Sequence, residues 1–495
     1  MSVILNEVRR STYLDSIVLM RISRHVATLP GVEEAGLVIG TPANKDILRE
    51  AGILGPDGDT AEPGDLILAL RAKDSAAGEA ALAEAKRLID QPAASSATSS
   101  DDAPRTLRAA VRAMSDANLA LISVPGHFAA DEARKALRLG LNVLIFSDNV
   151  PIEDEVALKG EARELGLLVM GPDCGTAIIG GVPIAFANVV PRGDIGIIGA
   201  SGTGIQEVSC LIARAGGGIS HAIGTGGRDL NAQVGAITTL MAIDALDADT
   251  ATNHIVLISK PPADAVAKLV LARVARSRKP FTVCFLGAST LALPGNARAA
   301  ATLEAAAEFA IGTAVTTKQA ELPLVHSGCG KLVRGLFAGG TLCSEAQIVF
   351  TQAGIKVASN VPTPGALSVT DATGGHLMID LGADEFTRGR PHPMIEPAVR
   401  DQALAEALAD PEIGVILLDA VLGFGAHPDP AGHLASVLAG QNRGPLILAS
   451  VTGTDSDPQP RAAQVRKLIE AGVIVADSSA EAARMAIAAI GAANR

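Results

Sequence analysis

The chain has 495 residues, of which 48% are hydrophobic but only 2% aromatic, so aliphatic side chains must build its cores. Its 41 basic and 53 acidic residues give a net charge of -12, the wrong sign for a protein that neutralises nucleic-acid phosphates over a broad face. The shortage of aromatic rings also removes platforms for base stacking. We therefore expect no nucleic-acid partner, and the length predicts three or four domains.

The five cysteines are scattered without a Cys-x-x-Cys pair, which predicts neither a disulfide framework nor a zinc site. Free thiols favour a reducing compartment. The N-terminus carries charge within its first ten residues and lacks the apolar core of a signal peptide, and no stretch is long and apolar enough to span a membrane. The sequence thus predicts a cytoplasmic protein with no metal site and no membrane contact.

The first part of the chain, residues 1–90, predicts a small α/β module. Its apolar runs and helical periodicity indicate strand 3–8, helix 15–29, strand 33–39, helix 43–51, strand 65–71 and helix 75–90. The next segment, QPAASSATSSDDAP at 91–104, is low in apolar residues and rich in Ser, Ala and acid, which is typical of a flexible linker.

The rest of the chain alternates buried apolar runs with helical stretches rich in Ala, Glu, Lys and Arg. This alternation predicts parallel strands covered by helices on both faces, and therefore an α/β fold throughout. The clearest predicted strands are 119–124, 142–147, 167–170, 195–198, 255–259, 281–286, 414–419 and 446–451. We expect a unit at 105–190, a second at 191–320 and a third at 321–495.

One glycine-rich turn stands out. Residues 196–204 follow an apolar strand and open a helix, so glycines let a ligand approach while exposed amides and the helix dipole attract an anion. Ser201 and Thr203 add hydroxyl donors. The alternative is a capped turn without a ligand. A similar pattern recurs at 331–347, where Gly339, Gly340 and Thr341 form the turn and a Glu again follows the threonine by four residues, which predicts two equivalent helix N-termini.

Other loops follow predicted strands where ligands gather at the carboxyl edge of a parallel sheet. In GTGGRD at 224–229, Arg228 suits a phosphate or carboxylate, with a plain surface loop as the alternative. For Cys174 in GPDCG, the favoured interpretation is a buried, small hydrophobic residue. In the last unit, Arg388, Arg390 and His392 form a rigid cationic segment, and His427 lies beside glycine turns. For both histidines a structural role is the alternative.

Three segments together resemble the α subunit of succinyl-CoA synthetase. They are 118–175, including GPDCG, the Ser-Gly-Thr helix in 193–207, and GTGGRD with the strands IVLIS and FTVCFL. Residues 411–490 are similar to the flavodoxin-like carboxyl domain of the β subunit. The resemblance implies a Rossmann-like CoA-binding-type domain at 105–190 and CoA-ligase-type domains at 191–320 and 321–495. The first CoA-contacting loop of that family is not evident, although IGTPANK, with Asn44, could occupy an analogous turn.

Nearly the whole chain resembles the FdrA family of acyl-CoA synthetase-like proteins, through IGTPANK, DCGTAI, GRPHPMIEP and VTGTDSDPQ. The phosphohistidine of the synthetases is missing, because the loop after 281–286 contains no His, and Lys260 stands where their orienting Glu lies. FdrA-type proteins have been connected with the carbamoyltransfer step of allantoin breakdown, in which oxalurate and phosphate give oxamate and carbamoyl phosphate. The resemblance implies a hetero-oligomer with other subunits of that pathway, or a homodimer, acting on an anionic small molecule.

Three functions follow as hypotheses. The first is a phosphate-linked carbamoyl or acyl transferase, in which phosphate or carbamoyl phosphate is a substrate and no cofactor is required. The second is a nucleotide- and CoA-dependent acyl-CoA synthetase with His392 or His427 as phosphocarrier, and the third is a non-catalytic scaffold. For the first, the catalytic candidates are Lys260, Arg228 and His392; the phosphate-binding candidates are Ser201, Gly202, Thr203, Gly226, Gly227, Gly339, Gly340 and Thr341; the substrate-binding candidates are Asp173, Cys174, Asn44, Arg388, Arg390 and His427.

Overall fold

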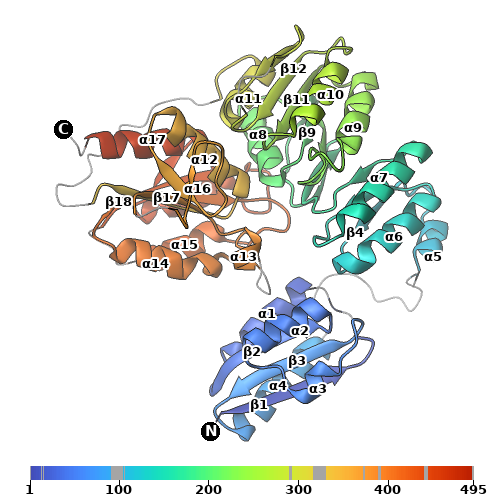
Figure 1. Ribbon diagram of the computed structural model, residues 1–495. Helices are drawn as coiled ribbons and strands as arrows, with labels where there is room; N and C mark the ends of the chain where they lie inside the picture. Colours follow the sequence, from blue (N-terminus) through green and yellow to red (C-terminus); the bar gives the residue numbers. More distant parts are fainter. Residues whose placement is uncertain are drawn as a thin grey trace. The chain divides into compact units, whose positions relative to one another are not determined.

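The computed structural model describes residues 2–12, 14, 16–90, 104, 106–288, 292–315, 330–371, 374–387, 392–439 and 444–492. Contacts divide the chain into two compact units, one formed by residues 1–103 and 384–391 and the other by residues 104–383 and 392–495. Most of the predicted linker 91–104 lies outside the described residues. The α/β class predicted from the sequence is confirmed in both units (Figure 1).

The first unit is built on a three-stranded antiparallel sheet in the order β1-β3-β2. The central strand β3 is almost wholly buried, because α1 and α4 pack on one face of the sheet and α2 and α3 on the other. Its elements, with the short helix α13 included, are β1 (Val3–Arg9), α1 (Ser16–Ala27), β2 (Val32–Ile39), α2 (Pro42–Glu50), α3 (Pro56–Asp59), β3 (Leu66–Ala72), α4 (Ser75–Asp90) and α13 (Asp384–Thr387). The predicted strands and long helices agree with these bounds within about two residues.

The second unit begins with a small parallel sheet of three strands in the order β4-β5-β6. Short alanines on one face of α6 let this helix approach the sheet closely, and all of them are buried. The elements are α5 (Leu107–Ala113), β4 (Leu119–Ile122), α6 (Gly126–Arg138), β5 (Asn142–Ile145), α7 (Ile152–Leu165) and β6 (Val169–Met170).

A seven-stranded sheet follows, in the order β13-β12-β11-β9-β10-β7-β8, with β9 at its centre. One face packs on α8 and α11, the other on α9 and α10. The elements are β7 (Thr176–Ile179), β8 (Val182–Ala185), β9 (Arg192–Gly199), α8 (Gly202–Arg214), β10 (Ile219–Gly224), α9 (Ile237–Ala248), β11 (His254–Ser259), α10 (Asp264–Val274), β12 (Phe281–Phe285), β13 (Ala297–Ala299) and α11 (Leu303–Ile311).

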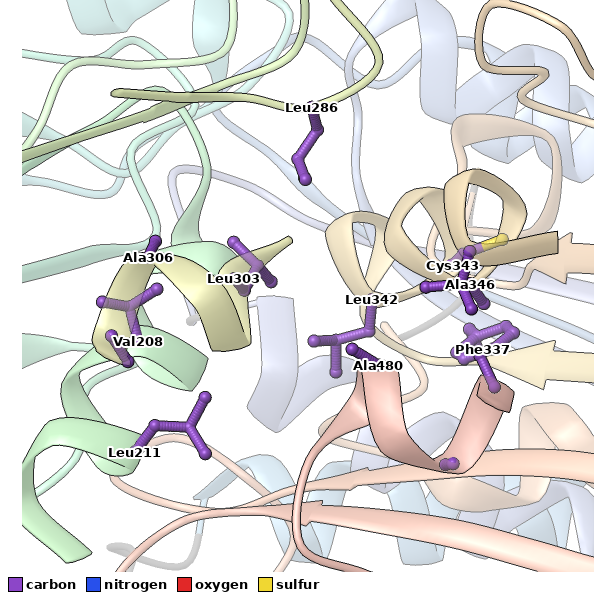
Figure 2. Close-up of a cluster of buried hydrophobic side chains, with 14 of the residues drawn as sticks. Val208, Leu211, Leu286, Leu303, Ala306, Phe337, Leu342, Cys343, Ala346 and Ala480 are labelled. Atoms are coloured by element: carbon purple, nitrogen blue, oxygen red, sulfur yellow. The ribbon is translucent and has the colours of Figure 1, made fainter. Parts of the chain in front are cut away.

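The last sheet has seven parallel strands in the order β16-β15-β17-β14-β18-β19-β20. Helices α12 and α17 cover the face that meets α8 and α11 of the previous sheet, so one hydrophobic core joins the two (Figure 2). The elements are β14 (Leu332–Phe337), α12 (Gly340–Gln352), β15 (Val357–Ser359), β16 (Leu367–Ser368), β17 (His376–Asp380), the 3-10 helix η1 (Pro397–Arg400), α14 (Asp401–Ala409), β18 (Ile413–Val421), α15 (Pro430–Leu438), β19 (Leu446–Thr452), α16 (Arg461–Glu470), β20 (Ile474–Ala476) and α17 (Ser479–Ala492).

Candidate functional site

The two glycine-threonine turns predicted to be equivalent meet in the structure. Helix α8 starts at Gly202 and α12 at Gly340, each directly after the central strand of its sheet. Ser201 caps α8 by accepting the amide of Gly204 at 3.0 Å, and its hydroxyl group also forms a hydrogen bond with that of Thr341. Because the first amides of a helix have no partner within it, two sets of free donors come together here.

The turn before α12 is already supplied with carboxylates. Asp419 accepts the amides of Ala338 and Gly339, both at 2.7 Å, and buried Arg400 donates to Asp419 at 3.1 Å. A Cβ at Gly340 would also lie 2.5 Å from Asp380 Oδ2. Negative charge at this helix N-terminus lowers its attraction for a further anion.

The turn before α8 has a different neighbour. A Cβ at Gly202 would meet only Thr176 within 4 Å, with the hydroxyl oxygen at 2.9 Å. Among the described residues, no carboxylate therefore lies within 4 Å of this Cβ position, in contrast to Gly340. Of the two helix N-termini, that of α8 is the better suited to an anionic ligand.

Lys260 lies at the same edge of the sheet. Strands β11 and β9 are parallel and pair Ile258 with Gly199, so Lys260 follows this pair by two residues, as Ser201 does on the neighbouring strand. The side chain of Lys260 is exposed and makes no hydrogen bond or ion pair with the other described residues. Its charge is thus available beside the N-terminus of α8.

Two further predicted loops join this edge. The amide of Thr225 donates to Gly199 at 2.9 Å, which ties the GTGGRD loop to the start of α8. Gly226 has a φ of +82°, and a Cβ there would lie 2.3 Å from the carbonyl oxygen of Pro172, so glycine is required where this loop touches GPDCG. A Cβ at Gly227 would meet only Asp173, at 3.8 Å.

Cys174 lies in the same contact but is fully enclosed. Burial raises the pKa of its thiol to about 12, so the group stays protonated at neutral pH and is no nucleophile there. The other described cysteines, Cys210, Cys284 and Cys343, are also free and buried, and Cys329 lies outside the described residues.

A buried lysine, which the sequence analysis missed, anchors the GTGGRD loop. Lys159 of α7 donates to Glu155 and Asp229, both at 2.8 Å, and to the carbonyl oxygen of Thr225 at 3.0 Å. Arg228 pairs with Glu155 at 2.9 Å while its side chain remains 41% exposed. The sequence of α7 does not signal this cluster, because Asp229, which shares Lys159 with Glu155, lies 70 residues further along the chain.

His392 lies near the start of α12. A Cβ at Gly382 would be 2.6 Å from His392 Nε2, 2.9 Å from the carbonyl oxygen of Ala338 and 3.2 Å from Asp380 Oδ1, so these groups surround one point. Burial lowers the pKa of His392 to about 4. The amide of Met394 donates to Nδ1 at 3.2 Å, so the neutral ring carries its proton on Nε2.

The remaining candidates differ in position. His427 lies close to the His392 segment, since its amide donates to Met394 at 2.8 Å, and its Nδ1 accepts the amide of Asp429 at 3.0 Å. Arg388 and Arg390 lie outside the described residues. Asn44 belongs to the other unit, where IGTPANK forms a strand-to-helix turn and Asn44 Nδ2 donates to Ile39 at 2.8 Å.

Within the described ranges, no group of three or more His, Cys, Asp or Glu side chains is arranged to hold a metal ion. In the same part of the chain, no helix combines the length and the apolar character needed to cross a bilayer.

Three family models match parts of the chain. One for the AllF heavy metal-associated domain matches residues 1–105, one for a CoA binding domain matches 192–287, and one for CoA-ligase matches 336–489. The fold and these matches define a multidomain α/β protein that contains an AllF-type heavy metal-associated domain, a CoA binding domain and a CoA-ligase domain.

Comparison with curated proteins gives the family. The uncharacterized protein YahF of Escherichia coli (strain K12) is 43% identical over 494 residues, which are 95% of this chain and 96% of YahF. The chain therefore belongs to the YahF family.

More distant relatives are succinate-CoA ligase [ADP-forming] alpha subunits. That of Methanothermobacter thermautotrophicus is 29% identical over 187 residues, and subunit alpha 2 of Archaeoglobus fulgidus is 27% identical over 175 residues. These alignments cover 37% and 31% of this chain, and the chain spans 60% of each ligase subunit.

Proposed function

We propose that the chain is a subunit of a phosphate-linked carbamoyl or acyl transferase, specifically of the FdrA type, and that its reaction is that of oxamate carbamoyltransferase. The observation that carries the proposal is the N-terminus of α8. No carboxylate of the described residues lies within 4 Å of the Cβ position of Gly202, Ser201 and Thr341 supply hydroxyl groups, and Lys260, which pairs with no other described residue, lies at the same edge. Such a site favours phosphate or a phosphate-containing product.

The chemistry needs little more than positioning. A phosphate oxygen attacks the ureido carbonyl carbon of oxalurate, the bond from that carbon to the oxamate nitrogen breaks, and the leaving nitrogen takes up a proton. Amide and hydroxyl donors at the α8 N-terminus hold phosphate, and Lys260 offsets its charge. In this scheme Arg228, Gly226 and Gly227 line the same edge, and Asp173 and Cys174 border the acceptor.

The loop that follows β12 supports direct attack by phosphate. No histidine occurs between His254 and His326, so this part of the chain supplies no side chain for a phosphohistidine relay. His392 is neutral at pH 7 and carries its proton on Nε2, where it donates rather than attacks. We assign His392 the role of a hydrogen-bond donor to the substrate. His427, Arg388 and Arg390 are further candidates for binding its carboxylate. Asn44 is a substrate-binding candidate in the other unit.

The test is an assay of carbamoyl phosphate formed from oxalurate and inorganic phosphate, by the full chain assembled with the other subunits of its complex. We expect product that depends on phosphate and needs neither nucleotide nor CoA. Ser201→Ala and Lys260→Gln should lower turnover at subsaturating phosphate at least tenfold. The matched control is Lys268→Gln, an exposed lysine on α10. Absence of product from the complete assembly contradicts the proposal.

A second function, acyl-CoA synthesis, is favoured by the CoA binding and CoA-ligase matches at 192–287 and 336–489. It assigns CoA and a nucleotide as ligands and predicts a hetero-oligomer, since the aligned succinate-CoA ligases are named as alpha subunits. Incubation with γ-labelled ATP should then give acid-labile protein phosphate, lost in His392→Asn or His427→Asn. Absence of label removes this function. Unchanged kinetics of Ser201→Ala and Lys260→Gln in an active assembly would leave the chain as a scaffold.

A further inference from the structure

Two glutamates lie inside the core that joins the last two sheets. Figure 2 shows the apolar side chains of this core, with Val208 and Leu211 of α8 on one side and Leu342 and Ala346 of α12 on the other. Glu207 and Glu345 occupy matching positions on these helices, each four residues after the threonine of its turn. Both are buried, with relative exposures of 2% and 0%.

Glu207 reaches from α8 into the neighbouring sheet. Its Oε1 accepts the amide of Ser479, the first residue of α17, at 3.2 Å. Its Oε2 accepts the hydroxyl proton of Thr452, at the end of β19. A residue of one domain therefore satisfies a free amide at the start of the last helix of the other.

Glu345 makes the corresponding contact in the opposite direction. Its Oε1 accepts the amide of Leu303, the first residue of α11, at 2.6 Å. Helix α11 packs against α8, just as α17 packs against α12. Each central helix thus binds the N-terminus of the outer helix that belongs to the other domain.

We propose that Glu207 and Glu345 form a reciprocal clasp that positions α8 and α12, and that one proton, held by Glu345, keeps this clasp closed. The charge of Glu207 acts on Glu345 inside this dry core, and two ionised carboxylates there repel each other, so one proton per pair is the favoured state. The clasp lies between the two sheets and concerns their alignment, so it does not depend on the proposed reaction.

The surrounding charges decide which member holds the proton. Glu207 has a cation beside it, since its charge acts on the guanidinium of Arg461. Glu345 faces Glu207 and Glu304, and no cation from α11 or α17 offsets them, because Arg484 pairs with Glu304 at 2.7 Å. Glu345 also faces the buried thiol of Cys284 on β12, and Glu481 and Asp477 lie near Glu304 and Arg461 at the start of α17.

The hydrogen bonds of Glu345 act against burial. Glu345 Oε2 and Ser479 Oγ are both buried and have no hydrogen-bond partner by strict geometry within the described part of the chain. The amide of Leu303 and the side chain of Ser479 each lower the pKa of the Glu345 carboxyl, and burial outweighs them. Burial, and next the charge of Glu207, raise the pKa of Glu345 to about 8.

The first test is the pH dependence of thermal unfolding for the full chain. The folded state binds a proton at Glu345 that the unfolded state releases near its ordinary pKa of 4.5, so the associated stability is full below that pH and is lost as pH rises through about 8. Glu345→Gln keeps the acceptor for Leu303 and stays neutral. We expect its melting temperature to exceed that of the wild type by several degrees near pH 9, by a margin that shrinks on acidification.

The matched control is Glu470→Gln on α16, an exposed glutamate outside this core, which should follow the wild type at every pH. If the melting temperature of Glu345→Gln changes with pH in parallel with that of the wild type, the proposal is contradicted. If this variant fails to fold, infrared spectroscopy of the wild type still decides. A protonated carboxyl band should persist at neutral pH and vanish on titration through about pH 8; its absence at neutral pH contradicts the proposal.

Hydrogen exchange tests the reciprocal geometry. Glu345→Ala should increase exchange at the start of α11, and Glu207→Ala at the start of α17, each in the domain that does not carry the substitution. In each variant, the increase in exchange rate of the peptide that covers this helix start should be at least several-fold larger than the increase in the remaining helices. Increased exchange confined to the substituted helix would show that neither residue clasps the other domain.

Discussion

The hydroxyl groups of Ser201 and Thr341 form a hydrogen bond although 140 residues separate them in the chain. Ser201 is the N-cap of α8, and Thr341 is the second residue of α12. Their contact brings two helix N-termini to one place, and the carboxylates of Asp419 and Asp380 lie at the start of α12. A pair of similar turns has thus acquired different electrostatic surroundings.

Replacing Ser201 by Ala should weaken phosphate binding and destabilise α8. The change removes the cap of Gly204 and one hydroxyl from the anion site, so we expect about 1 kcal/mol lower unfolding free energy. The affinity for inorganic phosphate, measured by calorimetry, should fall about tenfold or more. Thr106→Ala, which removes the cap of α5, is the control: it should cost similar stability while phosphate affinity is retained.

Replacing Lys260 by Gln should act on binding alone. The side chain is exposed and unpaired among the described residues, so its removal should leave the melting temperature unchanged. Loss of one positive charge should weaken phosphate binding and flatten its dependence on salt. Titrations at low and high ionic strength measure both effects, and an identical salt dependence in the variant would place Lys260 away from the anion.

Replacing Lys159 by Met should be strongly destabilising. The substitution leaves Glu155 and Asp229 as buried carboxylates without their shared cation, which costs about 3–5 kcal/mol. Urea unfolding measures the loss. Lys135→Met breaks an exposed pair with Glu132 and should cost about 1 kcal/mol or less. If the two variants lose the same unfolding free energy, the buried cluster does not stabilise the fold more than an exposed ion pair does.

His392 should make the protein less stable in acid. Burial lowers its folded-state pKa to about 4 from an ordinary 6.5, so the unfolded chain takes up a proton first as the pH falls. The stabilisation is present above about pH 6.5 and is lost as pH falls through about 4. His392→Gln should reduce the slope of melting temperature against pH over this range. A slope equal to that of the wild type would mean that the imidazole is hydrated.

Much of the fold follows from local sequence pattern. Apolar runs such as 255–259 and 281–286 predict strands that the structure shows at nearly the same bounds, because parallel strands covered on both faces need uninterrupted aliphatic residues. The short strands β7 and β8 and the helix α3 have no comparable signal. Two to four residues are too few to show a period.

The candidate site divides in the same way. The glycines and hydroxyl residues of the α8 and α12 turns were predicted because helix starts carry a local signature. That Asp419 and Asp380 supply carboxylates to the start of α12 was not predictable, because these residues lie on other strands. The positions of Arg388 and Arg390 lie outside the described residues, so their role stays a prediction.

The sequence by itself determined the α/β class, the capped helix starts and the absence of histidine after β12, since each depends on neighbouring residues. Only the tertiary structure decided which distant groups meet: Ser201 with Thr341, Lys159 with Asp229, and Glu345 with Leu303. The physical reason is that burial and charge act through space. A glutamate four residues after a threonine is ordinary in the chain, and it becomes a proton-holding clasp only where a second carboxylate and a helix start face it in a dry core.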